Sequence, residues 1–309
     1  MSPVKARARH GLNPRTALSR YALARAASFA LMLMSAHVAM AQDAEDAPDL
    51  MQTLLAEDAT LNNNLNLIQV RWVHGLDRRE LALGFGVEKI VTKNLGLEVM
   101  SEWADIDSNS GRSGSGFGNV DVTLKYVVWK QAESGFQIAL TPAISVRTSS
   151  RIGNDVQSSS AGMGVSWGGR LSFLRNAGWK RYFRAFEFQG DLGYSRELGA
   201  SSADDFYFDP EIDYSLPYLT YAAAPKVPWP LRNLCIFAEF NFDQPLSSPN
   251  GSTMFVTPGV AYLNDYLQIT SGIQIALNRA ASTSERTALI GSVTISLDSM
   301  YPVFARTLN

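Results

Sequence analysis

The sequence has few of the residues that build metal and redox sites. Its 309 residues include one cysteine, Cys235, and three histidines. A single cysteine excludes an intramolecular disulfide. Two of the histidines, His10 and His37, lie within the first 41 residues. Without that part, one histidine and one cysteine remain, too few for a His/Cys metal site of the usual kind. We therefore expect neither a metal nor another cofactor.

Acidic residues are absent from the N-terminus. Residues 1–41 carry six basic residues and no acidic one. An apolar stretch at 26–41 ends in Ala39-Met40-Ala41, which matches the small-x-small pattern that signal peptidase reads. The stretch is shorter than the about 20 residues of a spanning helix, and polar residues interrupt it. The sequence therefore predicts a cleaved signal peptide at 1–41 in preference to an uncleaved membrane anchor.

Basic residues are in deficit once the signal is removed. Subtracting its six from the 27 basic residues leaves 21 against 29 acidic residues, a net charge of −8. An acidic protein is a poor candidate for nucleic-acid binding. We expect no nucleic-acid partner.

The chain has little helical periodicity after residue 63, where apolar and polar residues alternate instead. In 267–277, for example, Leu267, Ile269 and Ile273 alternate with Gln268, Thr270 and Gln274. Period two is typical of a strand, because successive side chains point to opposite faces. The pattern predicts twelve strands: 65–74, 80–88, 95–103, 119–129, 136–147, 162–173, 182–194, 206–221, 234–243, 253–262, 267–277 and 287–297.

These strands predict an all-β fold, a transmembrane antiparallel β-barrel of about twelve strands at 64–298, with a C-terminal tail at 299–309. The export signal indicates that the apolar face is outside and contacts lipid. With the N-terminus in the periplasm, the outer connections 104–118 and 148–161 are long and the inner turn 263–266 is short, as in porin-like barrels. A soluble β-sandwich, the alternative, does not explain the signal and this asymmetry together. We expect a protein of the Gram-negative outer membrane.

Residues 42–63 form a separate acidic segment, with six acidic residues and no basic one. Leu50, Met51, Leu54 and Leu55 give it a short helical stripe after Pro48. We expect this segment in the periplasm. It is either a plug or docking helix or, alternatively, an ordinary flexible leader.

The polar face of the strands predicts the lining of the lumen. It is mostly acidic, with few basic residues: Glu98, Glu102, Asp121, Glu187, Asp191, Asp209, Glu211, Asp213, Glu239 and Asp243, against Lys125, Arg147 and Arg170. An acidic lining would concentrate cations and repel anions. The alternative is a packed lumen in which the basic residues pair with the acids. Glycines at inward positions, Gly84, Gly86, Gly164 and Gly168, would widen the bore or let a segment approach.

A catalytic role has little support in the sequence. An outer-membrane lipase needs a serine and a histidine with an orienting Asn or Asp. The only histidine after residue 41 is His74, in a predicted turn without a neighbouring serine. We therefore expect no enzyme.

One stretch carries a family resemblance. It contains Gly116, Gly118, Asn119, Asp121, Lys125 and Tyr126. It resembles the Gly-x-Gly-Asp-x-x-x-x-x-Lys-Tyr element of the family named for the MetA-pathway of phenol degradation, with Asn119 where that family usually has Asp. The resemblance implies an outer-membrane, transporter-like barrel that takes up hydrophobic or aromatic compounds. Such barrels commonly end in an aromatic residue that the barrel-assembly machinery reads, a part that Phe304 would play here from five residues inside the end.

We therefore expect a channel or transporter for small solutes, with outer-membrane lipid, the barrel-assembly machinery and a small-molecule solute as its partners. The alternative is a narrow, plugged barrel whose outer loops have a structural, adhesive or surface-recognition role.

Overall fold

The computed structural model describes residues 50–75, 78–108, 113–131, 136–149, 151–152, 155–170, 178–199, 203–222, 226–246 and 251–300. The predicted signal peptide, residues 42–49 and Phe304 lie outside these ranges. None of the helices in the described ranges is long and apolar enough to cross a membrane.

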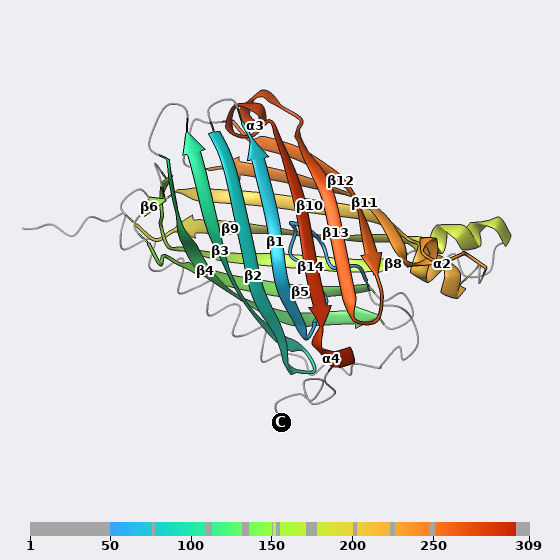
Figure 1. The fold of residues 1–309 in the computed structure, drawn as a ribbon. Helices are drawn as coiled ribbons and strands as arrows, with labels where there is room; N and C mark the ends of the chain where they lie inside the picture. Colours follow the sequence, from blue (N-terminus) through green and yellow to red (C-terminus); the bar gives the residue numbers. More distant parts are fainter. Residues whose placement is uncertain are drawn as a thin grey trace, which may run out of the picture. The chain divides into compact units, whose positions relative to one another are not determined.

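Twelve strands form a closed antiparallel barrel (Figure 1). They are β1 (Asn64–His74), β2 (Arg78–Thr92), β3 (Leu95–Ser108), β4 (Gly114–Gln131), β5 (Phe136–Val146), β8 (Ser160–Arg170), β9 (Phe186–Glu197), β10 (Asp204–Ser215), β11 (Leu234–Pro245), β12 (Thr253–Leu263), β13 (Leu267–Ala276) and β14 (Thr287–Ser296). Each strand pairs with its neighbour in the chain, and β1 pairs with β14 to close the sheet. The predicted fold and strand number are confirmed.

The two faces of the sheet have opposite chemistry. Large apolar side chains point outward and are exposed, among them Phe85, Ile236, Ile273 and Leu289. Polar side chains point inward and are buried, among them Glu88, Gln137, Glu187, Glu239 and Thr257. A soluble sandwich would instead bury its large apolar side chains. The outer face is therefore the one that contacts lipid.

Two predicted strands are shorter in the structure, because helical turns occupy their periplasmic ends. Strand β9 begins only at Phe186, after the 3₁₀-helix η2 (Gly178–Ala185). Strand β10 ends at Ser215 and continues as α2 (Leu216–Ala222). Pro217 lies in the first turn of α2, where its missing N–H breaks no helical hydrogen bond.

Pro210 is accommodated inside β10 by its neighbours. It lies opposite Gly190 of β9, whose φ of +148° leaves no room for a side chain. The pairing between β10 and β11 is interrupted at Asp209 and Pro210, and the N–H of Phe242 donates to the Asp209 carboxylate instead. This agrees with the irregularity that proline predicts in a strand.

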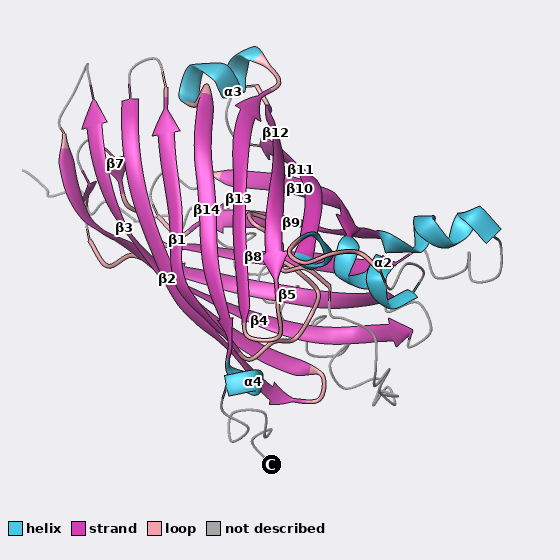
Figure 2. Cartoon of the chain, turned by 45° about the vertical axis from the view of Figure 1, so that its right-hand side comes forward, coloured by secondary structure: helices cyan, strands magenta, loops and turns pink. Residues whose placement is uncertain are grey.

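The connections at the two ends differ. At the end where β1 begins and β14 ends, the chain forms η2, α2, η3 (Leu231–Asn233) and α4 (Leu297–Met300). At the other end it forms α3 (Arg279–Ser284) and a small hairpin, β6 (Arg151–Ile152) with β7 (Asp155–Val156) (Figure 2). The hairpin carries Ile152 onto the inner face of the barrel, against Ala82, Ala104 and Ile106.

Candidate functional site

The lumen is occupied by the chain's own N-terminal segment, residues 50–63. The segment is irregular rather than helical, so the predicted helical stripe at Leu50–Leu55 is not formed. Leu50, Met51, Leu54 and Asp58 are buried. The described part of the segment lies inside the barrel, which favours the plug over a flexible leader.

Apolar contacts hold the first half of this plug. Met51 and Leu54 are buried in a cluster with inward-facing residues of four strands: Val73, Cys235, Phe237, Ala261, Ala288 and Ile290. Cys235 is thus a small packed residue of the lumen. Leu50 of the plug packs against Gly168 of the wall. A Cβ at position 168 would lie only 2.9 Å from the end of the Leu50 side chain. Gly168 therefore lets the plug approach the wall.

Acidic residues of the wall accept hydrogen bonds from the backbone of the plug. The N–H of Leu55 lies 3.1 Å from both carboxylate oxygens of Glu239, and the N–H of Ala56 donates to the same carboxylate. The N–H of Glu57 donates to Asp191 at 3.2 Å. An irregular segment has no internal partners for these N–H groups, so the wall supplies them.

Glutamines of the wall complete the backbone pairing. Gln189 donates to the carbonyl of Met51 at 2.7 Å, and Gln69 donates to that of Leu54 at 2.9 Å. Gln268 exchanges two hydrogen bonds with the backbone of Gln52, at 2.8 and 3.1 Å. These contacts come from β9, β1 and β13, so the plug is held from several sides of the barrel.

The periplasmic end of this wall holds one ion pair. Arg170 Nε lies 2.6 Å from Glu187, and its guanidinium stacks 4.5 Å from the centre of the Tyr218 ring. Glu211 and Asp213 are buried beside it, where both accept hydrogen bonds from Gln189. The acids of β9–β11 therefore act in packing, as the packed-lumen alternative supposes.

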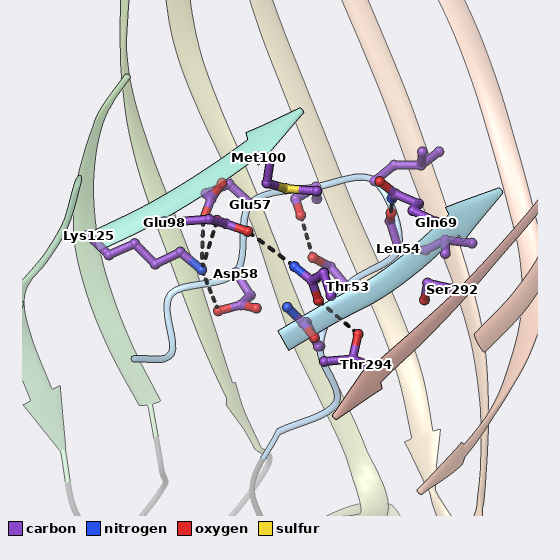
Figure 3. Close-up of a pocket in the computed structure, with 14 residues that line it drawn as sticks. Thr53, Leu54, Glu57, Asp58, Gln69, Glu98, Met100, Lys125, Ser292 and Thr294 are labelled. Atoms are coloured by element: carbon purple, nitrogen blue, oxygen red, sulfur yellow. Dashed lines mark hydrogen bonds and ion pairs between the residues drawn. The ribbon is translucent and has the colours of Figure 1, made fainter. Parts of the chain in front are cut away.

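Lys125 holds the second half of the plug. Its Nζ lies 2.8 Å from Glu57 and 3.4 Å from Asp58 of the plug, and 3.7 Å from Glu98 of the wall (Figure 3). It also lies 3.4 Å from Glu88 of the wall. The lysine side chain is only 2% exposed. We call Lys125 and these four acidic residues the latch. The carboxylates compensate the buried ammonium for its lost hydration, and two of them belong to the plug, so the cluster joins the plug to the wall.

Glu57 brings a titrating carboxyl to this latch from the plug. Its pKa is raised to about 7, chiefly by burial and also by the carboxylates of Glu98 and Asp58, against the lowering effect of Lys125. The side chain is 24% exposed, so protons can reach it. The plug therefore carries a titrating group at its contact with the wall.

The plug does not fill the lumen on the side of β1–β4 and β14. A cavity of about 150 Å³ lies between residues 52–58 and the wall, beside Asn66, Ser292 and Thr294 (Figure 3). A second cavity of about 270 Å³ adjoins it. Both cavities are lined by Glu57, Gln69, Glu98 and Met100. These four residues mark the boundary between the two spaces.

The second cavity is acidic. Glu102 and Asp121 line it with Gly84 and Thr123, and both carboxylates are exposed within the barrel. Beyond it, toward the end that carries α3, the ion pairs Arg71–Glu285 and Arg78–Glu80 lie at the mouth. Charged side chains thus line the inner face from the α3 end of the barrel to the plug.

The structure separates the predicted lining residues into groups. Glu98 and Lys125 belong to the latch, Glu102 and Asp121 to the open cavity, and Glu187, Asp191, Glu211, Asp213, Glu239 and Arg170 to the packed wall. Asp209 serves the backbone of β11, whereas Asp243 is exposed near the far end of that strand. Arg147 follows the last residue of β5 and is exposed at the rim.

Sequence reasoning missed several residues that hold the plug: Glu88, Gln69, Gln189, Gln268 and, in the plug itself, Glu57 and Asp58. Glu88 follows Gly84 and Gly86 in the inward alternation of β2, so the period-two pattern already places it in the lumen. The same pattern places Gln268 on the polar face, but an uncharged glutamine there does not indicate that it contacts the plug. His74 is exposed at the end of β1, opposite Thr287 and Arg79.

No protein-family model matches the chain, and no curated protein matches it in sequence. Solved structures do. The COG4313 outer membrane channel from Pseudomonas putida F1 aligns with 11% identity and a TM-score of 0.51, over 80% of this chain and 99% of that one. The KdgM porin aligns at 12% and 0.45, over 74% and 98%, and the NanC porin at 10% and 0.45, over 75% and 98%. The chain therefore has the fold of Gram-negative outer-membrane β-barrels.

Proposed function

We propose that this protein is an outer-membrane channel for small polar solutes, with a lumen partly closed by the plug at residues 50–63. The observation that carries the proposal is the pair of adjoining polar cavities beside the plug. A barrel that served only as a scaffold would have no need of cavities lined by polar side chains along one wall. The channels and porins among the structural neighbours support the same reading.

The lining favours cations over anions. Glu102 and Asp121 line the larger cavity, and Glu57 and Glu98 lie at its inner boundary. Carboxylates along a narrow passage raise the local concentration of cations. The resemblance to the phenol-degradation family instead suggests hydrophobic or aromatic solutes. The polar cavity walls favour hydrophilic ones, and uptake of phenol and of a small ammonium ion into liposomes would distinguish the two.

Single-channel recording in a planar bilayer tests the proposal. The full-length folded protein should give small, cation-preferring steps. Replacing residues 50–56 by a Gly/Ser segment of equal length should raise the conductance several-fold, because the apolar contacts of Met51 and Leu54 are lost and a Gly-rich segment costs more entropy to hold in one conformation. Glu102→Gln with Asp121→Asn should weaken the preference for cations. Asp105→Asn, which removes an exposed charge on the same strand as Glu102, is the matched control.

A silent wild type and a silent Gly/Ser variant, both shown to be folded by heat-modifiable gel mobility, would overturn the channel. That outcome would favour the second candidate, a plugged barrel with a structural or adhesive role. The many hydrogen bonds between the plug and the packed wall are the observation in its favour. No catalytic activity is proposed.

A further inference from the structure

Two connections at the periplasmic end differ in charge from the rest of the chain. Residues 171–185 and 216–233 together carry six basic residues and no acidic one, whereas the chain after residue 41 is strongly acidic. Both connections follow β-strands that end on the same rim, β8 and β10. The two connections are neighbours on this rim, because β8, β9, β10 and β11 lie side by side in the sheet.

The helical turns of these connections pack against each other. We call η2, α2 and the stretch 226–233 the basic platform. Arg184 of η2 donates to the hydroxyl of Tyr218 in α2 at 3.1 Å, and Phe183 stacks on Phe186 with ring centres 5.9 Å apart. In Figures 1 and 2, α2 lies beyond the ends of the neighbouring strands. The platform is thus a built part of the fold that extends past the barrel wall.

The platform exposes aromatic and basic side chains together. Trp229 is 68% exposed and Tyr221 56%, and Tyr182, Phe183 and Leu231 are exposed as well. Lys226 and Arg232 are exposed beside them. Aromatic rings with a polar edge favour the headgroup level of a bilayer, and basic side chains there are attracted to anionic lipids. Water alone would be a poor environment for so many exposed aromatic groups.

We infer that the basic platform binds anionic phospholipid headgroups in the periplasmic leaflet of the membrane around the barrel. The exposed rings would lie at the headgroup level, and Lys226 and Arg232 would pair with lipid phosphates. The complementarity of charge argues for a lipid surface, since no acidic side chain in either connection competes for these cations. The inference needs the barrel to sit in a membrane but not to conduct, so it can fail independently of the proposed channel.

Native mass spectrometry of the detergent-solubilised full chain tests the inference, with phosphatidylglycerol and phosphatidylcholine of the same acyl chains as probes. The wild type should retain phosphatidylglycerol preferentially. Lys226→Glu with Arg232→Glu should reduce that preference by about fivefold or more for each charge, given the usual worth of a basic side chain at an anionic surface. Arg279→Glu with Arg286→Glu, two exposed charges at the opposite end, is the matched control and should leave the preference unchanged.

A second measurement does not depend on the charge variants. In nanodiscs containing phosphatidylglycerol, the fluorescence that is lost in Trp229→Phe should be quenched by a headgroup-labelled nitroxide lipid and protected from iodide. Quenching by iodide alone would place Trp229 in water and overturn the inference. Equal retention of both lipids by the wild type would also overturn it, and would point instead to a soluble protein partner for the platform.

Discussion

The two sides of the lumen treat the same plug differently. The β8–β11 wall contacts the plug directly, and its acids accept the backbone N–H groups of residues 55–57. The β1–β4 and β14 wall leaves two polar cavities, and its acids surround Lys125 instead. Carboxylates of one barrel thus serve as fixed acceptors on one side and surround a buried lysine beside two cavities on the other. Acidity of the lining alone does not tell which part is open.

Removing Lys125 from the latch should have the largest effect on this difference between the two sides. Lys125→Met removes the ammonium and leaves Glu88 and Asp58, both at most 2% exposed, without their cation. Removing one partner of a buried ion pair usually costs about 3–5 kcal/mol. We expect the plug to leave the latch side, which should raise the single-channel conductance toward that of the Gly/Ser variant.

Two further variants distinguish loss of the latch from a general loss of barrel stability. Lys130→Met removes an exposed lysine from the same strand and should leave the conductance unchanged. Adding Glu88→Gln to Lys125→Met removes one of the stranded charges and should restore part of the closed state. If Lys125→Met conducts like the wild type while the Gly/Ser variant conducts more, the latch is not what holds the plug.

Proton binding to Glu57 gives a smaller, graded effect. Its pKa of about 7 in the seated plug lies above the ordinary glutamate value of 4.5. The seated plug therefore binds the proton more tightly than the released one, so the proton stabilises the seated state. This stabilisation is complete below about pH 4.5 and is lost as the pH rises through 7. We expect the open probability of the channel to rise between pH 5 and 8.

Glu57→Gln is the variant that isolates this group. A glutamine resembles the protonated acid and keeps three carboxylates around Lys125, so the rise of open probability with pH should be flattened. Glu197→Gln, at the outer end of β9, serves as a control of equal charge change. An unaltered pH profile in Glu57→Gln would assign the titration to other groups.

The local sequence pattern predicts the barrel strands, but it does not predict that residues 50–63 fill part of the lumen. Alternation such as Leu267-Gln268-Ile269 marks an inward and an outward face wherever a strand forms, and it locates the twelve strands. The ends of β9 and β10 were predicted less well, because the aromatic residues of η2 and α2 also suit a strand. Local pattern cannot distinguish these alternatives where the chain leaves the sheet.

The plug depends on contacts between residues far apart in the sequence. Leu55 meets Glu239, and Asp58 meets Lys125, across separations that no local pattern records. The acids of the lumen could be predicted from their inward positions. Their division between a packed wall and an open cavity could not, because it depends on which of them the plug covers.

Alanine substitutions at two glycines, one on each side of the lumen, test the two sides separately with small structural changes. An alanine at Gly168 would place its Cβ 2.9 Å from the tip of Leu50, and an alanine at Gly84 would place its Cβ 3.2 Å from Gln69 Oε1. The first presses on the plug, and the second presses on a side chain that borders both cavities. Because each neighbour is a flexible side chain, the cost of overpacking should stay near the low end of about 1–3 kcal/mol.

The two alanine variants should therefore change the current in opposite directions. Gly168→Ala loosens the seat of the plug on the packed side and should slightly raise the open probability without changing the size of the step. Gly84→Ala narrows the cavity and should chiefly reduce the size of the step, because the hydrogen bond from Gln69 to Leu54 is only one of those that hold the plug. Recordings in which both variants chiefly alter the same quantity would mean that the plug and the cavity are not separate features of the lumen.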